Sequence, residues 1–458
     1  MKQKFTILMM ALVGATSIAT AQYDAQDCVA NLSIFVEHAK VKNYDAAYEP
    51  WMLVRKNCPQ QSSATFVYGE RILKDRIKNG ADKKAEVNDL IKMYDEWAQY
   101  FPTKKGVSQL GKIYAKKALQ MIDNNVGTDA DAYAVLNKGY TEDKASFSDP
   151  KALYYYFKLY YDQYKGGSVT LESLFERYEE LTEKFEDEIE NLSKKLDKML
   201  KKEEAGTLTK KDQRNMKVYE TNSKAIGLFQ GNMDALISGE ASCENLIPLY
   251  EKNFEENKTN AIWLNRAASR MLSKECDTDP LFIKIVEGLD GINPSSDSKL
   301  YLANLYANRG DYSKSEDYLK QSIDLESDPY KKARKLYRAG LISKKKGRKA
   351  GARSYFNQAV AIQPSMGKAY MQIGYLYASS ANDCGGSQFE KRAIYWRAVD
   401  MFRKAGRVDA SLRSTTDKLV DSYMQRAPSK TDIFQQGMQG KTININCWIG
   451  GTVKVPSL

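Results

Sequence analysis

The segment SANDCGGSQFE, which ends at Glu390, carries the most reactive combination of side chains in this sequence. A cysteine thiolate is a nucleophile, and two adjacent glycines leave backbone N–H groups open to an anion. The same segment could instead be a binding loop, or a structural staple through Cys384. The rest of the sequence has to decide between an active site, a binding loop and a staple.

The usual catalytic partners are missing from the sequence. Its single histidine, His38, lies beside Phe35 and Val36 in an apolar stretch that is typical of a packed helix. No Walker loop and no GxGxxG motif occur, and the pair Gly385-Gly386 is too short a signal for phosphate binding. No CxxC motif suggests a metal site either. We therefore expect no catalytic residues, no cofactor and no metal.

The first residues, MKQKFTILMMALVGATSIATAQ, have the organisation of a secretory signal peptide. Lys2 and Lys4 precede a short apolar run, and an A-T-A triplet predicts cleavage before Gln22. A membrane anchor is the alternative, which the short and interrupted apolar run disfavours. We predict that residues 1–21 are a signal peptide of an exported protein of the periplasm or cell envelope, with no transmembrane segment in the mature chain.

The 458-residue chain has a formal net charge of +11, which becomes +9 once Lys2 and Lys4 are removed with the leader. A basic balance can favour anionic partners. Acidic and basic residues are mixed along most of the chain, however, so we interpret the charge as a source of solubility. We expect protein partners and no nucleic acid.

Self-similarity with a period of roughly 34 residues is the strongest pattern in the sequence. Small residues alternate with large ones, a glycine turn separates two helix-forming stretches, and Pro364 begins a new unit. A single unit cannot bury its apolar face, so such units stack into a solenoid. The pattern resembles the tetratricopeptide repeat (TPR) and is clearest over residues 296–410. Its main positions are Ala303, Gly310, Leu319, Gly340, Gly347, Ala352, Phe356, Gly374, Ala398 and Phe402.

Weaker copies of this spacing precede the clear units. Trp51 and Pro59, and later Trp97 and Pro102, fit the second helices of two degenerate repeats. We therefore predict TPR-like helical repeats over residues 22–165. A tyrosine-rich helix closes this region, and its rings suit repeat packing better than a ligand cage.

Between Thr170 and Met233 apolar residues recur every three or four positions, with charged residues between them. This spacing predicts long amphipathic helices. The stretch from Thr209 to Asp212 is similar to a capping box and begins the second helix. We interpret residues 166–239 as a charged, coiled-coil-like helical hairpin that projects from the array; two unusually long repeat helices are the alternative.

Residues 240–426 are predicted to hold the C-terminal TPR array, with an insertion at 379–391. In the last segment, 427–458, apolar residues alternate around the sequence INCWIGG, which predicts a small β-hairpin. The predicted fold is therefore an all-α, TPR-type α-solenoid of antiparallel helix pairs, with a long helical hairpin insertion and a C-terminal β-hairpin.

The six cysteines of an exported protein favour disulfides. Many pairings are possible, but in an antiparallel helix pair the start of the first helix lies beside the end of the second. Two pairs of cysteines bracket predicted helix pairs in this way. The predicted disulfides are Cys28–Cys58, Cys243–Cys276 and Cys384–Cys447, the last of which ties the insertion to the terminal hairpin.

The groove of a TPR array is lined by its first helices, and here those helices are basic. Arg334 and Arg338 lie one helical turn apart and could together hold a carboxylate or phosphate. This partly resembles the carboxylate clamp by which some TPR domains hold an acidic peptide end, although Tyr301 stands where that clamp has an asparagine. A solvated basic helix is the alternative. The predicted peptide-binding residues are Tyr301, Asn304, Asn308, Arg334, Tyr337, Arg338, Lys344, Lys345, Lys368 and Tyr375.

Four pieces resemble a family of exported TPR proteins of Gram-negative bacteria: CENLIPLYEKNFEENKTNAIWL, YASSANDCGGSQFEKRAIYWRAVD, APSKTDIF and INCWIG. The resemblance covers nearly the whole mature chain and implies an envelope α-solenoid with no settled biochemical activity. By analogy of fold, it implies a non-catalytic protein-binding scaffold or adaptor of the cell envelope, with protein or peptide partners that include acidic ones. The alternatives are a structural subunit of an outer-membrane or secretion assembly, and an enzyme acting on the envelope polymer.

Overall fold

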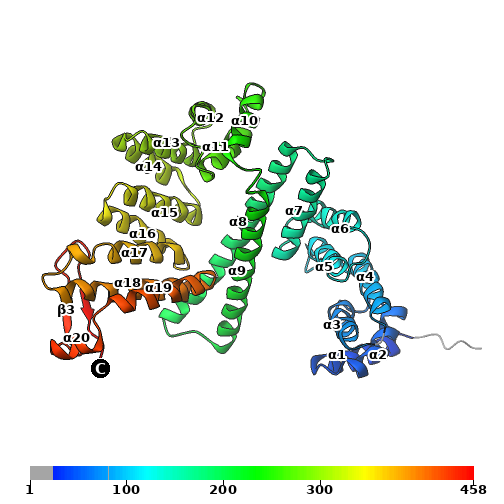
Figure 1. Ribbon diagram of the computed structural model, residues 1–458. Coiled ribbons are helices and arrows are strands. Elements are labelled where there is room, and N and C mark those ends of the chain that lie inside the picture. Colours follow the sequence, from blue (N-terminus) through cyan, green and yellow to red (C-terminus); the bar gives the residue numbers. More distant parts are fainter. Residues whose placement is uncertain (1–23, 81, 458) are drawn as a thin grey trace, which may run out of the picture. The chain divides into compact units, whose positions relative to one another are not determined.

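The computed structural model describes residues 24–80 and 82–457 (Figure 1). These residues form twenty α-helices, two 3₁₀ turns and two short antiparallel strand pairs. The predicted all-α solenoid with a long helical hairpin and a small C-terminal β-hairpin is confirmed. The predicted signal peptide and its cleavage site lie outside the described residues. Within those residues, no helix is both long enough and apolar enough to cross a membrane.

The chain divides into two compact units, one ending at Ala152 and the other beginning at Leu153. The boundaries that we expect from the sequence after residues 165, 239 and 426 stay predictions. We call the two parts the N-terminal unit and the C-terminal unit, and each is described separately.

Three helix pairs and a short strand pair make up the N-terminal unit. Its core is aromatic: Trp51, Phe66 and Tyr94 are fully buried, and the Trp51 indole donates to the Thr65 carbonyl at 2.7 Å. The elements are α1 (Ala25–Lys40), α2 (Tyr44–Asn57), α3 (Ala64–Asn79), α4 (Lys83–Tyr100), β1 (Thr103–Lys104), β2 (Val107–Ser108), α5 (Leu110–Asp123) and α6 (Asp129–Glu142), followed by the start of α7 (Pro150–Lys165).

The C-terminal unit begins with the rest of α7 and two long helices, α8 (Leu171–Glu204) and α9 (Lys210–Ile237). Thr209 and Asp212 form the predicted capping box at the start of α9. Stacked helices follow (Figure 1). They are α10 (Cys243–Asn257), α11 (Ala261–Ser273), α12 (Pro280–Ile292), α13 (Ser296–Asn308), α14 (Tyr312–Leu325), α15 (Pro329–Lys345), α16 (Lys349–Ile362), α17 (Gly367–Ala378), α18 (Gln388–Val408) and α19 (Arg413–Arg426), with 3₁₀ turns η1 (Ala381–Asp383) and η2 (Ala410–Leu412).

The chain ends in α20 (Lys430–Gln435) and an antiparallel pair of strands, β3 (Thr442–Asn444) and β4 (Thr452–Lys454). The predicted β-hairpin is present but shorter than the alternating pattern suggested. Cys447 and Ile449 lie in the connecting loop, where the Gly450 N–H donates to the Cys447 carbonyl at 3.0 Å. Gly450 and Gly451 both have positive φ angles, which glycine adopts at little cost.

The helices of one repeat touch where a glycine faces a phenylalanine. A Cβ atom added to Gly340 on α15 would lie 2.4 Å from the Phe356 ring on α16. Gly374 on α17 meets Phe402 on α18 in the same way, with 2.6 Å to the nearest ring carbon. The small and large positions read from the sequence are therefore in direct contact.

The expectation that the long hairpin projects from the array is wrong. Helix α8 packs along the stacked helices, as Figure 1 shows. Its Leu200 joins Tyr370, Ala405 and Val408 in one buried cluster. A helix this amphipathic buries its apolar stripe wherever a complementary surface is available, and the array supplies one.

The Gly340–Phe356 contact can be tested by substitution. We expect Gly340→Ala to lower the free energy of unfolding by about 1–3 kcal/mol, because the added methyl overpacks a fully buried ring. Gly231→Ala is the matched control, since nothing lies within 4 Å of its Cβ position on α9. That change should be neutral or stabilising by roughly 0.5–1 kcal/mol. Equal effects in urea-unfolding curves would contradict the proposed close approach.

Candidate functional site

The insertion at residues 379–391 is a staple in this structure. Cys384 is bonded to Cys447, with their Cα atoms 5.4 Å apart. The other two predicted pairs, Cys28–Cys58 and Cys243–Cys276, are also present, and no described cysteine is free. A thiol held in a disulfide cannot serve as a nucleophile.

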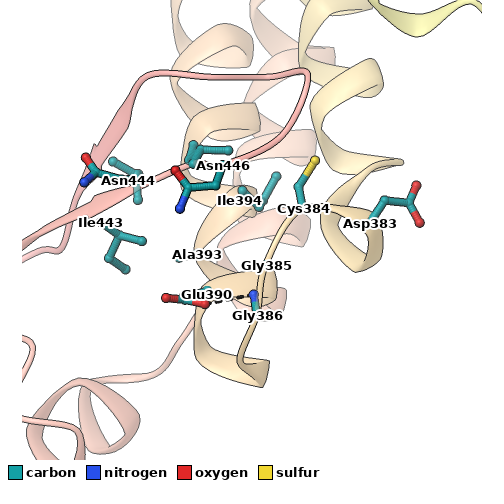
Figure 2. Close-up of a pocket in the computed structure, with 12 residues that line it drawn as sticks. Asp383, Cys384, Gly385, Gly386, Glu390, Ala393, Ile394, Ile443, Asn444 and Asn446 are labelled. Carbon is teal, nitrogen blue, oxygen red and sulfur yellow. Dashed lines mark hydrogen bonds between the residues drawn. The ribbon is translucent and has the colours of Figure 1, made fainter.

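A pocket of about 240 Å³ lies between the insertion and the terminal hairpin (Figure 2). Asn444 and Asn446 line one side, and the backbone of Gly385 and Gly386 lines the other. Glu390 is already engaged, because its carboxylate accepts from the Gly386 and Ser387 N–H groups, each at 2.9 Å. These bonds begin α18 and hold the pKa of Glu390 below its ordinary value. The carboxylate is a helix cap, and the second lining carboxylate, Asp383, forms an ion pair with Lys349 at 3.3 Å.

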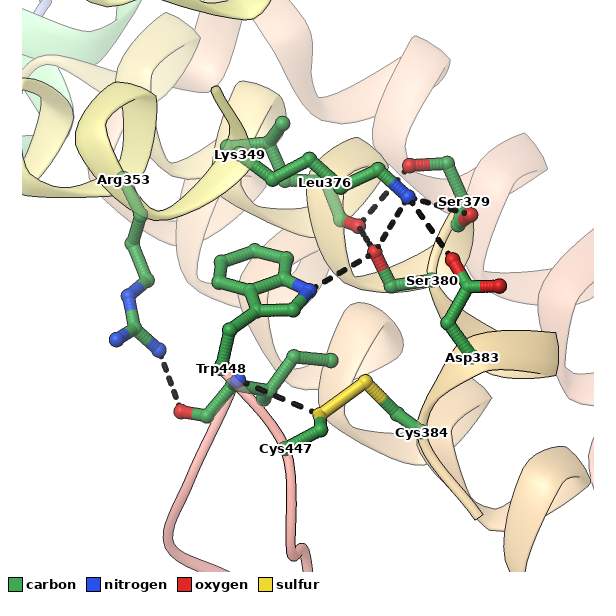
Figure 3. Close-up of a disulfide and its surroundings, with 10 residues drawn as sticks. Lys349, Arg353, Leu376, Ser379, Ser380, Asp383, Cys384, Cys447 and Trp448 are labelled. Carbon is green, nitrogen blue, oxygen red and sulfur yellow. Dashed lines mark hydrogen bonds and ion pairs between the residues drawn. A yellow bond between two sulfur atoms is a disulfide. The ribbon is translucent and has the colours of Figure 1, made fainter. Parts of the chain in front are cut away.

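The surroundings of the Cys384–Cys447 disulfide are structural (Figure 3). The Lys349 ammonium donates to the Ser380 hydroxyl at 2.9 Å and pairs with Asp383 at 3.3 Å. The Trp448 indole donates to the same Ser380 hydroxyl at 3.3 Å, and Arg353 donates to the Ile449 carbonyl. The hairpin is therefore fixed to α16 and to the end of α17 by side-chain contacts as well as by the disulfide.

Replacing Cys384 and Cys447 with serine should loosen the terminal hairpin. We expect a loss of about 2–4 kcal/mol of stability, the usual range for a native disulfide. Hydrogen exchange should accelerate over residues 441–455. The control is Cys28→Ser with Cys58→Ser, which removes a disulfide from the other unit and should leave that protection unchanged. Unaltered exchange at 441–455 in the first variant would contradict the role of the staple.

Most of the residues predicted to line the peptide groove already have partners within the protein. Asn304 and Asn308 both donate to Asp277, and Lys345 donates to Asn308 at 3.5 Å. Lys344 donates to the Gln372 side chain at 2.7 Å. Three others are packed rings, since Tyr301 is 6% exposed, Tyr337 lies against Phe356 and Tyr375 against Phe402. Arg338 and Lys368 are exposed.

Arg334 has a partner from a distant part of the chain. Its guanidinium pairs with Glu190 of α8 at 3.2 Å. Two arginines of α11 do the same, because Arg266 lies 3.4 Å from Glu183 and Arg270 pairs with Glu179. The first part of α8, residues 171–190, contains nine acidic and two basic residues. Carboxylates for Arg334 and for the arginines of α11 are thus supplied by a helix of the same chain.

Apolar and buried polar contacts anchor the second part of α8. The Asp197 carboxylate, which is 3% exposed, accepts from the Tyr330 hydroxyl and the Ser365 N–H, each at 2.7 Å. Burial raises the pKa of Asp197 above its ordinary value, and the two hydrogen bonds only partly oppose the shift. This side chain fixes α8 to the start of α15 and to the loop before α17.

Asp197 offers a test of this contact. Asp197→Leu should cost about 1–3 kcal/mol in unfolding free energy, because it leaves the Ser365 N–H buried without an acceptor. Asp197→Asn keeps one acceptor and should cost less.

The pH dependence of stability gives a second test. Since burial raises the folded-state pKa of Asp197, the stabilisation from the protonated carboxyl is complete below the ordinary pKa of 3.8 and is lost as pH rises through the raised pKa. A wild-type protein that gains stability over Asp197→Asn as pH rises would contradict this.

A second basic surface, which the sequence reasoning missed, lies in the N-terminal unit. It is a cleft of about 640 Å³ between α3 and α5, which are the first helices of two successive pairs. The end of α4 and the β1–β2 turn close it. We call this the N-terminal cleft, and its lining residues are Ser63, Val67, Glu70, Arg71, Lys74, Trp97, Phe101, Thr103, Lys104, Lys105, Gln109, Lys112, Ile113 and Lys116.

The β1–β2 turn positions two of these lysines. Thr103 pairs with Ser108 and Lys104 with Val107, which leaves Lys105 and Gly106 as the two turn residues. Both have positive φ angles, of 53° and 78°, as tight hairpin turns require. The sequence signal for the cleft was the pair of lysines one turn apart on α5, together with Arg71 and Lys74 on α3.

Six cations and one carboxylate line the N-terminal cleft. That carboxylate, Glu70, pairs with Lys74 at 2.7 Å and with Lys116 at 2.5 Å. Burial alone would raise the pKa of Glu70, but the two lysines outweigh it and hold the pKa below its ordinary value. The other four lining cations are Arg71, Lys104, Lys105 and Lys112.

Comparison with known proteins identifies the repeats. The tetratricopeptide repeat family matches residues 299–329 and 333–366, which include most of α13 to α16. The chain therefore contains tetratricopeptide repeats over these residues. The match confirms the predicted family resemblance at the level of the repeat.

Individual TPR proteins are more distant. A stretch of 101 residues is 29% identical to the photosystem I assembly protein Ycf3 of Rippkaea orientalis and covers 22% of this chain. The match spans 58% of the length of that relative. Among solved structures, MamA is 18% identical over 42% of this chain and 96% of its own, with a TM-score of 0.29.

Two further solved structures are similar over more of the chain. Human IFIT1 bound to m7Gppp-AAAA is 14% identical, covers 80% of this chain and 76% of its own, and has a TM-score of 0.33. A tetratricopeptide repeat protein of Parabacteroides merdae is 10% identical, covers 66% and 94%, and has a TM-score of 0.24. At these scores the likenesses carry no argument about function.

Proposed function

We propose that this TPR protein is a non-catalytic adaptor of the bacterial cell envelope that holds a protein partner in the N-terminal cleft. TPR arrays form extended surfaces on which partners bind. The name of the Ycf3 relative, an assembly protein, is in keeping with such a role.

The observation that carries the proposal is the difference between the two basic surfaces. In the C-terminal unit, α8 already pairs with Arg334 and with the arginines of α11. In the N-terminal unit, the described residues leave a cleft of about 640 Å³ with most of its cations unpaired. A surface with unused binding capacity is the better candidate for a partner.

Two features of the chain support an envelope location. The first residues have the pattern of a signal peptide, and all six cysteines are paired in disulfides. Disulfides form and persist in oxidising compartments outside the cytoplasm. The non-catalytic part of the proposal is supported by Cys384 and Glu390, the reactive side chains of the insertion, which have structural roles.

The alternative of a structural subunit in an outer-membrane or secretion assembly used both the convex face of the array and a projecting hairpin. Because α8 packs on the array, the hairpin does not project as a docking element. This alternative would have to use the convex face.

A matched pair of variants tests the adaptor proposal. Lys104→Glu with Lys112→Glu reverses two exposed charges in the N-terminal cleft, and Arg338→Glu with Lys344→Glu makes the same charge change in the array. In crosslinking pull-downs from envelope extracts, we expect the first variant to lose the wild-type partners at least about tenfold, which corresponds to roughly 1.4 kcal/mol. The second variant should retain them.

The reverse pattern would contradict the proposal, since it would place the partner on the groove that the sequence predicted. Loss in neither variant would equally exclude the N-terminal cleft.

A further inference from the structure

The two basic surfaces of this chain differ in whether carboxylates of the same unit neutralise their cations. On the array, three arginines meet carboxylates of α8, and Glu179 accepts from Arg270 while also lying 3.8 Å from Arg266. The occupant is an acidic, amphipathic segment that also brings apolar side chains such as Phe175 and Leu181, both buried. In this protein, a basic surface is therefore complemented by carboxylates together with apolar side chains.

The N-terminal cleft has the same kind of surface, and no acidic helix among the described residues of its unit covers it. Within the described residues, Arg71, Lys104, Lys105 and Lys112 have no carboxylate at ion-pair distance. Glu70 serves only the other two lining cations. The local charge is therefore strongly positive, and a bound anion would reduce it.

The lining cations influence one another at Lys112. The pKa of Lys112 lies below its ordinary value, first because the cleft removes water from around its ammonium group and then because of the neighbouring Lys116 and Lys104. Like charges held together without a counter-charge destabilise a fold, and clusters of this kind gather at functional sites.

The cleft also has an apolar side. Trp97 and Phe101 come from the end of α4, with Val67 and Ile113 from the flanking helices. The Trp97 ring is held by stacking on Phe66 and Tyr94, with centroids 6.2 and 6.3 Å apart. A rigid aromatic surface beside cations fits a ligand that carries both carboxylates and an apolar group.

Length favours a peptide over a small anion. The lining residues of α3 run from Ser63 to Lys74, which at about 1.5 Å per residue spans roughly 16 Å. An extended peptide rises about 3.3 Å per residue, so about five residues match this distance.

We propose that the N-terminal cleft binds a short, extended acidic segment of a partner protein, with two or more carboxylates on the lysine rim and one apolar side chain on Trp97 and Phe101. This inference rests on the proposed adaptor function and names the chemistry of its partner. It needs no free peptide end, because the cations surround the cleft rather than one end of it.

The test uses the full mature chain and a dye-labelled pentapeptide, Glu-Glu-Leu-Asp-Glu, acetylated and amidated so that its ends carry no charge. Two matched peptides replace either the acids with their amides or the leucine with serine. We expect the acidic peptide to bind at least tenfold more tightly than the amide peptide in fluorescence anisotropy, and its affinity to fall as salt rises. The serine peptide should bind more weakly than the leucine peptide.

Variants place the binding on the cleft. Lys104→Gln with Lys112→Gln should weaken binding of the acidic peptide at least tenfold, whereas Lys344→Gln with Lys368→Gln should leave it unchanged. Both pairs are exposed, so the fold should survive, which circular dichroism would confirm.

Several outcomes would overturn the inference. They are equal affinity for the acidic and amide peptides, an unchanged affinity in the cleft variant, and displacement of the peptide by inorganic phosphate at equal concentration. Binding to vesicles of phosphatidylglycerol that is lost in the cleft variant, without peptide binding, would assign the cleft to lipid instead. If pull-down partners depend on the cleft but the acidic peptide shows no preference, the adaptor proposal stands and only the ligand class is wrong.

Discussion

The close approach of two helices within each repeat is the constraint on which the rest of this structure depends. In two repeats it depends on a glycine that faces a large ring, since Gly340 faces Phe356 and Gly374 faces Phe402. Such a pair leaves apolar surface on both sides, so it must stack on neighbours. Stacking in turn creates a continuous surface with charged groups exposed on it. Where another part of the same unit covers these groups, the surface is structural, and where they stay uncovered, they can bind a partner.

Helix α8 meets that need in the C-terminal unit. Its acidic first part neutralises arginines of α11 and α15, and its second part buries Leu200 and Asp197 against the array. Individually, partly exposed ion pairs such as Arg334–Glu190 stabilise little. These ion pairs matter more for binding specificity, because arginines that already pair with α8 are not available to other anions. The N-terminal cleft lacks such a helix within its unit, so its charge remains available.

The insertion between α17 and α18 shows how reactive residue types can be entirely structural. Cys384 forms a disulfide, Glu390 caps α18, and the Ser380 hydroxyl accepts hydrogen bonds from Lys349 and Trp448. These residue types suggested a reactive site, but in the structure each of them forms a bond within the protein. The segment holds the terminal hairpin over the core of the last repeat, where Ile443, Ile449 and Val455 are buried.

The sequence by itself determined the features that local physics controls. Periodicity placed the repeat helices, and the capping box began α9 at Thr209. Bracketing by helix pairs predicted two disulfides and left Cys384 and Cys447 as the third pair, and all three pairs are present. Only the tertiary structure decided which surfaces are covered. Asp197 meets Tyr330 across 133 residues and Glu190 meets Arg334 across 144, and no periodic pattern encodes such pairings. The N-terminal cleft escaped prediction for the same reason, since lysines from α3, α5 and a two-residue turn become neighbours only when the helices stack.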